Sequence, residues 1–212
     1  MNDITTLILV AGKSSRFESS KSKIFHELGG LPIIDHIYYT AKKISKNNII
    51  FVCNKHNIDI LKKRFKHCKF SLQKKQSGTA DAVLSAKKFL AKNSNILILF
   101  GDVPLITLTT LRKLSNNFFK NKLSGSILVF NTKNPFGYGR VITQEEKVKS
   151  VTEEINASAD IKKISLCNSG VMLCKYNLLF SFIDKINNKN KKREKYLPDL
   201  FEICYQNKKS FT

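Results

Sequence analysis

The chain has 212 residues, 42% of them hydrophobic, and this length suits one α/β domain rather than two. Its apolar runs are too short and too often interrupted by charges to span a membrane, and it shows no secretory leader, so we expect a cytoplasmic protein. Its five scattered cysteines form no CxxC pair, so we expect neither disulfides nor zinc. A formal net charge of +21 attracts phosphate-bearing partners, but the lysines are spread along the whole chain with few aromatic residues among them, so we expect no nucleic-acid partner.

Strands and helices alternate in the first half of the chain. An apolar run at Thr5–Val10 predicts a strand, and Pro32 opens a segment with apolar residues at helical spacing. The alternation comprises the helix Ile33–Ile44, the strand Ile49–Cys53, the helix Ile58–Phe65, the strand Phe70–Gln73, the helix Thr79–Ala91 and the strand Ile96–Phe100. This pattern predicts parallel strands joined by helical crossovers, with ligands bound at the carboxyl ends of the strands.

The second half has a different pattern. A helix at Leu108–Phe119 is followed by short strands at Ser126–Asn131, Gly139–Thr143, Val148–Glu153, Ile164–Leu166 and Val171–Lys175, and then by helices at Tyr176–Ile186 and Leu197–Gln206. We therefore predict an α/β fold with a Rossmann-like, open, mostly parallel mixed sheet flanked by helices, and an antiparallel portion. The absence of a repeat or linker predicts a single domain, residues 1–212, with lobes at about 1–106 and 107–212.

The first candidate site follows the first strand. Small residues at Ala11 and Gly12 let the backbone approach a nucleotide closely, so that its N–H groups point at phosphate oxygens. Arg16 and Lys23 can then supply positive charge for a triphosphate. The loop is neither a P-loop nor a GxGxxG motif, and a plain strand-to-helix turn explains it about as well.

Two more candidates follow later strands. The amide of Gln73 offers a donor and an acceptor to the imide edge of uracil, and Gly78 would let the backbone reach the base. Capping of the next helix by Ser77 or Thr79 is an equal alternative. Asp102 follows the strongest strand, where a carboxylate is well placed to hold Mg²⁺ against phosphates. Capping of a helix is the alternative for Asp102 as well.

The second half carries a fourth group. Gly139 lies in strand-like surroundings, where glycine marks a bulge or a close approach to a ligand. Glu153 and Asn168 can hydrogen-bond sugar hydroxyls. Hairpin turns explain the glycines of this region equally well.

Taken in order, these segments resemble the nucleotide-sugar pyrophosphorylases, and most closely the N-acetylglucosamine-1-phosphate uridylyltransferase domain of a bifunctional bacterial enzyme. The likeness covers nearly the whole chain and rests on LVAGKSSRF with Lys23, QKKQSGTADA, FGDVPLI, NPFGYGRV, VTEE, CNSGV and EKYLPDLFEICYQ. It implies Mg²⁺-dependent attack by N-acetylglucosamine-1-phosphate on the α-phosphorus of UTP, without a covalent enzyme intermediate. The acetyltransferase β-helix of that enzyme is not expected here, because no hexapeptide repeat occurs.

The resemblance also implies roles for single residues. The first lobe would bind the nucleotide through Leu9, Ala11, Gly12, Gln73, Gly78 and Thr79. The second lobe would bind the sugar phosphate through Gly139, Glu153 and Asn168. The catalytic set would be Arg16, which stabilises the departing pyrophosphate, Lys23, which binds phosphate, and Asp102, which holds Mg²⁺.

The chain departs from the family pattern at several positions. The family has a small residue at Val10, a glycine at Ser14, a proline at Ser22 and a tyrosine at Phe100. Its second metal ligand, an asparagine after the last helix, has no counterpart in these 212 residues. Two alternatives therefore stay open, namely a related transferase with another nucleotide and sugar phosphate, and a nucleotide-sugar-binding module without turnover. The oligomeric state is also open.

Overall fold

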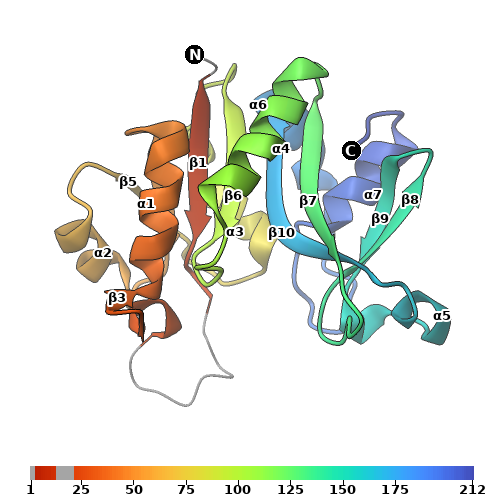
Figure 1. Ribbon diagram of the computed structural model, residues 1–212, viewed down its shortest axis with the longest axis horizontal. Helices are drawn as coiled ribbons and strands as arrows, with labels where there is room; N and C mark the ends of the chain where they lie inside the picture. Colours follow the sequence, from red (N-terminus) through yellow and green to blue (C-terminus); the bar gives the residue numbers. More distant parts are fainter. Residues whose placement is uncertain (1–2, 13–21) are drawn as a thin grey trace.

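The computed structural model describes residues 3–12 and 22–212, which form one large sheet flanked by helices (Figure 1). The strand order is β5-β4-β1-β6-β10-β8-β9, and β7 pairs with β10. The strands are β1 (Ile4–Leu9), β4 (Ile49–Cys53), β5 (Lys69–Leu72), β6 (Asn95–Phe100), β7 (Gly125–Asn131), β8 (Arg140–Gln144), β9 (Lys147–Thr152) and β10 (Leu166–Lys175).

The sheet has a parallel and an antiparallel part. Strands β5, β4, β1 and β6 pair in parallel, as the alternation of strands and helices predicts. Strand β10 is antiparallel to β6, β7 and β8, and β8 is antiparallel to β9. The predicted mixed α/β sheet is therefore confirmed, whereas its division into lobes near residue 106 stays a prediction.

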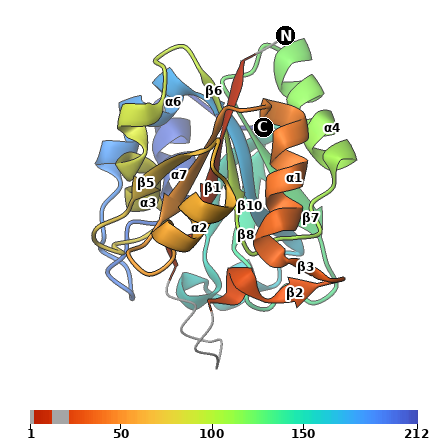
Figure 2. The same ribbon diagram turned by 90° about the vertical axis from the view of Figure 1, so that its left-hand side faces the viewer.

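Helices cover both faces of the sheet (Figure 2). One layer holds α1 (Ile33–Ser45), α2 (Ile58–Arg64) and α4 (Leu108–Lys120), the other holds α3 (Thr79–Ser85), α6 (Tyr176–Phe182) and α7 (Asp199–Gln206), and a short α5 (Ala159–Lys162) follows β9. Because successive strand residues point to opposite faces, β1 places Leu7 in one core and Ile8 in the other. Among the described residues, no helix has the length and apolarity needed to cross a membrane.

Several predicted elements differ from the observed ones. The strands expected at Ile164–Leu166 and Val171–Lys175 are one strand, β10, whose register shifts between Asn168 and Met172. The helix expected over Thr79–Ala91 ends at Ser85, whose carbonyl accepts a hydrogen bond from the Ser71 hydroxyl at 2.7 Å, and a 3₁₀ turn follows. The last two helices are shorter than predicted: α6 ends at Phe182 in a 3₁₀ turn, and α7 begins at Asp199.

Two features were not predicted. A small hairpin joins β2 (Glu27–Leu28) to β3 (Leu31–Pro32) through Gly29 and Gly30, which have φ angles of +59° and +80°. Two central residues with positive φ are what a tight hairpin turn requires. The residues Phe211 and Thr212 also join the sheet, because the Phe211 carbonyl accepts from Val148 N at 2.8 Å.

Candidate active site

The candidate residues of the first half gather at the carboxyl ends of the parallel strands. The loop at residues 10–12 follows β1, Gln73 follows β5, and Asp102 lies just after β6. These strand ends point to the lower edge of the molecule in Figure 1. The sheet topology therefore brings together residues that are far apart in the sequence, at the edge where open α/β sheets bind ligands.

The start of the loop after β1 is held by buried amides that the sequence analysis did not single out. Asn57 Nδ2 donates to the Val10 carbonyl at 2.7 Å, and Asn54 Nδ2 donates to the Ala11 carbonyl at 3.1 Å. Gln76 Nε2 also donates to the Ala11 carbonyl. A satisfied buried network of this kind fixes the backbone path towards Gly12. Both asparagines follow β4, so their place after a strand was the available signal.

Lys23 and Asp102 are brought together as a candidate catalytic pair. Lys23 Nζ lies 3.1 Å from Asp102 Oδ2, and the two side chains are 38% and 45% exposed. A cation and a carboxylate that both reach solvent at a strand end can meet a charged ligand without a large desolvation cost. Arg16, the third predicted catalytic residue, lies outside the described residues.

The residues after β5 are fixed by a segment near the C-terminus. We call Lys195–Leu197 the strap. Its backbone bonds to both sides of Gly78: Lys195 N donates to the Ser77 carbonyl at 2.7 Å, and Ala80 N donates to the Lys195 carbonyl at 3.0 Å. Leu197 N donates to the Thr79 hydroxyl at 2.8 Å, across 118 residues of sequence.

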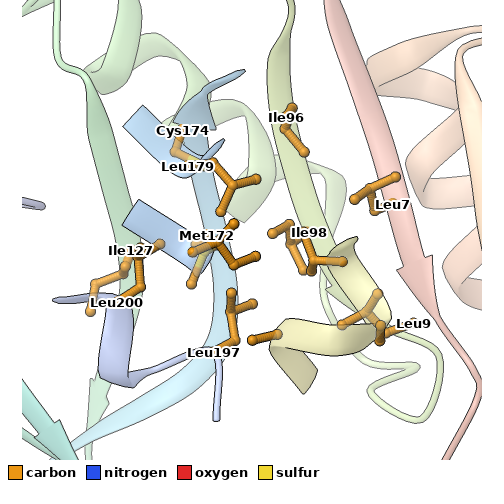
Figure 3. Packing of buried hydrophobic residues seen from close by; sticks show 14 of the residues in the cluster. Leu7, Leu9, Ile96, Ile98, Ile127, Met172, Cys174, Leu179, Leu197 and Leu200 are labelled. Carbon is orange, nitrogen blue, oxygen red and sulfur yellow. The ribbon is translucent and has the colours of Figure 1, made fainter. Parts of the chain in front are cut away.

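The strap explains why position 78 is a glycine. Gly78 has a φ angle of +119°, and a Cβ atom there would lie 2.6 Å from Lys195 N. Leu197 anchors the strap in the core, where Figure 3 shows it among the same cluster of side chains as Met172 and Ile98. Gln73 faces the same turn, since its Nε2 donates to the Gly78 carbonyl at 3.0 Å and to Asp81 Oδ2 at 2.9 Å. The amide donors of Gln73 are therefore engaged within the protein.

The strand register brings Gly139, Glu153 and Asn168 into one row. Arg140 pairs with Thr152 in β9 and with Cys167 in β10. Because both pairings are antiparallel, Gly139, which precedes Arg140, lies beside Glu153 and Asn168, which follow Thr152 and Cys167. Asn168 N donates to the Gly139 carbonyl at 2.9 Å. A Cβ atom on Gly139 would lie 3.4 Å from Glu153 Oε1, so the Glu153 carboxylate lies close to the backbone of Gly139. We call these residues the second-half row.

Glu153 and the nearby Asp199 are carboxylates whose pKa values are raised. Burial raises the pKa of Glu153, and Lys192 opposes the shift. Burial, followed by the charges of Glu153 and Glu202, raises the pKa of Asp199 to about 6. Glu153 therefore interacts with an acidic neighbour, Asp199, and a basic one, Lys192, and its carboxylate can accept hydrogen bonds from the hydroxyl and amide donors of a sugar.

The described residues offer neither a metal-binding cluster nor a reactive cysteine. They contain no group of three or more His, Cys, Asp or Glu side chains that could hold a metal ion by themselves. Burial raises the pKa of the Cys53 thiol to about 12 and that of Cys68 to about 11, so neither is a ready thiolate nucleophile.

The sequence matches the model of the MobA-like NTP transferase domain over residues 6–162. The chain belongs to this family. As an NTP transferase domain it is a nucleotidyltransferase, and the predicted family resemblance is confirmed.

Curated relatives of this NTP transferase include bifunctional GlmU proteins. The protein from Buchnera aphidicola subsp. Acyrthosiphon pisum is 35% identical over 204 residues, which are 96% of this chain and 44% of the relative. The protein from Campylobacter fetus subsp. fetus is 37% identical over 210 residues, or 96% of this chain and 47% of the relative. The chain therefore spans less than half the length of these relatives.

Solved structures share the fold. A Bacillus anthracis protein described as a glucose-1-phosphate thymidylyltransferase superposes with a TM-score of 0.77 at 17% identity, covering 99% of this chain and 86% of that one. A UDP-glucose pyrophosphorylase in complex with UDP-glucose gives a TM-score of 0.76 at 15% identity, covering 99% and 89%. At these identities the similarity concerns the fold alone. The family match supports nucleotidyl transfer as the reaction class of this chain.

Proposed function

We propose that this chain transfers the uridylyl group of UTP to N-acetylglucosamine-1-phosphate, giving UDP-N-acetylglucosamine and pyrophosphate in a Mg²⁺-dependent reaction. The observation that carries the proposal is the convergence of the motif residues. The pair Lys23–Asp102 lies at the carboxyl end of β6, and the second-half row follows from the register of β8, β9 and β10. Within each of these two groups, residues that are far apart in the sequence lie together in the fold.

The nucleotide would bind across the ends of β1, β5 and β6. The N–H groups of Ala11 and Gly12 would approach the phosphates, and the Lys23 ammonium would neutralise part of their charge. Gln73, Gly78 and Thr79 would lie beside the base and ribose. In this assignment residues 1–106 form the nucleotide-binding lobe and residues 107–212 the sugar-binding lobe.

The residues around Asp102 fit a magnesium ion. Asp102 is a half-exposed carboxylate 3.1 Å from Lys23 Nζ, and Mg²⁺ in phosphoryl-transfer sites commonly uses one or two carboxylates and completes its shell with water and substrate phosphates. When bound, the ion would neutralise charge that develops on the phosphates. When the magnesium ion and the phosphates are both bound, the Lys23 side chain would turn from Asp102 to the phosphates.

The sugar phosphate would lie against the second-half row. The Glu153 carboxylate and the Asn168 side chain would accept and donate hydrogen bonds to the sugar, and the backbone of Gly139 would lie beside them. This placement orients the sugar phosphate for in-line attack on the α-phosphorus. Catalysis would come from positioning and charge neutralisation, with Arg16 as the predicted group on the departing pyrophosphate.

The test is pyrophosphate release from UTP with N-acetylglucosamine-1-phosphate and Mg²⁺. Controls replace UTP with CTP or GTP, and replace the sugar phosphate with glucose-1-phosphate. We expect release with the first pair and little with the controls. Release with another pair instead would point to a related transferase, and UTP binding without any release would point to a binding module.

A further inference from the structure

Arg140 is a buried charge for which the proposed reaction has no assigned role. It opens β8, and its side chain is 2% exposed. Burying a guanidinium is costly unless it is paired, and replacing such a buried pair with apolar residues is often neutral or stabilising. The Nε atom of Arg140 is buried and has no hydrogen-bond partner among the described residues. A contribution to folding stability alone therefore does not account for an arginine at this buried position.

The partners of Arg140 come from three segments. Its Nη2 lies 2.6 Å from Glu154 Oε2, and it also donates to the carbonyl of Lys162 at 3.4 Å. Its Nη1 donates to the carbonyl of Tyr138. Glu154 Oε2 accepts a further hydrogen bond from Gly137 N at 3.3 Å. One ion pair thus joins the loop before β8, the turn after β9 and the end of α5.

These partners are the immediate neighbours of the second-half row. Arg140 follows Gly139, Glu154 follows Glu153, and the backbone of Arg140 pairs with Cys167, which precedes Asn168. Their contacts run through Arg140, Glu154 and the backbone of Gly137, Tyr138 and Lys162, and do not use the side chain of Glu153. The pair therefore holds the chain on either side of the row and leaves the Glu153 carboxylate unpaired by it.

We infer that Arg140 and Glu154 are positioning residues for the sugar phosphate: their ion pair sets the loop of Gly137–Gly139 against the Glu153 carboxylate. This inference rests on the proposed function, because the row is assigned there to the sugar phosphate. It predicts that loss of the pair weakens the use of the sugar phosphate and leaves the use of UTP unchanged.

The test compares Glu154→Gln with wild type in the full chain. Glutamine keeps the shape of the side chain but removes its charge. We expect the KM for N-acetylglucosamine-1-phosphate to rise roughly tenfold or more, because small displacements of positioning groups are costly, with a change in the KM for UTP below about twofold. Arg140→Lys is expected to act in the same direction, because an ammonium cannot replace the planar fork that reaches a carboxylate and two carbonyls.

Asp160→Asn is the matched control. It removes a carboxylate from an exposed ion pair of the same α5 helix, in which Lys163 Nζ lies 2.9 Å from Asp160 Oδ1. We expect it to leave both KM values unchanged. Melting temperatures of all variants show whether they fold.

Three results would overturn the inference. They are an unchanged KM for the sugar phosphate in a folded Glu154→Gln variant, an equal rise of both KM values, and independent additive effects of Glu154→Gln and Arg140→Lys in the double variant. Failure of the proposed function looks different, because wild type itself would then release no pyrophosphate with this substrate pair, and the inference would fall with it.

Discussion

Replacing Gly78 with alanine tests whether the strap holds the segment after β5. Gly78 has φ +119° and ψ 177°, a region open essentially to glycine alone, so alanine there costs about 1–3 kcal/mol. Its Cβ atom would also lie 2.6 Å from Lys195 N and push the strap away. That puts at risk the two backbone hydrogen bonds of Lys195 to Ser77 and Ala80, each of which contributes about 1 kcal/mol.

We therefore expect Gly78→Ala to lower the free energy of unfolding by roughly 3–5 kcal/mol. For a domain of this size each kcal/mol corresponds to about 2–4 °C in Tm, so the expected fall is about 6–20 °C. Thermal unfolding followed by circular dichroism measures it. Gly29→Ala is the control, because Gly29 also has a positive φ, +59°, but nothing described lies within 4 Å of its Cβ position. A Gly78→Ala variant that melts within a few degrees of the Gly29→Ala variant would refute the reasoning.

Three further predictions concern separate parts of the molecule. Asp102→Ala should abolish Mg²⁺-dependent pyrophosphate release without unfolding the chain, and near-normal turnover over a Mg²⁺ titration would remove Asp102 from the mechanism. Phe211→Ala should lower the free energy of unfolding in a urea titration by about 3–5 kcal/mol, because Phe211 is fully buried and packs on Gly125. Since burial and then Glu153 raise the pKa of Asp199 to about 6, its charged form opposes folding above that pH, so Asp199→Asn should raise the Tm at pH 8 and lose this advantage towards pH 4. An equal gain at both pH values would contradict that origin.

Much of the fold could be predicted because its signals are local. The strand Ile49–Cys53 was predicted with its observed bounds, since a fully apolar run between turn residues fits a strand buried on both faces. The sequence predicts two strands in place of β10, because the polar and small residues Asn168-Ser169-Gly170 interrupt its apolar run. The observed strand continues through a register shift, in which Gly170 with φ +83° packs against the Phe100 ring. The irregularity depends on the neighbouring strand, which no local pattern contains.

The candidate site divides in the same way. Residues directly after strands, such as Asp102, could be placed from the pattern alone, because parallel strands end at one edge. The contacts that fix Thr79 could not be predicted, since Leu197 reaches it from 118 residues away. The burial of Arg140 could not be predicted either, because a lone arginine after a glycine usually lies on the surface.

Charge across the site restricts how the substrates can lie. Lys23 places a cation at the β6 end. Glu153 and Asp199 are carboxylates with raised pKa values, and the charge of Glu153 contributes to the shift of Asp199. A phosphate placed against the second-half row would meet carboxylates, and a sugar placed there would meet hydrogen-bond acceptors. The phosphates should therefore lie towards β1 and β6 and the sugar ring towards β8 and β10. In-line transfer would then require the phosphate of the sugar phosphate to face the α-phosphate of the nucleotide.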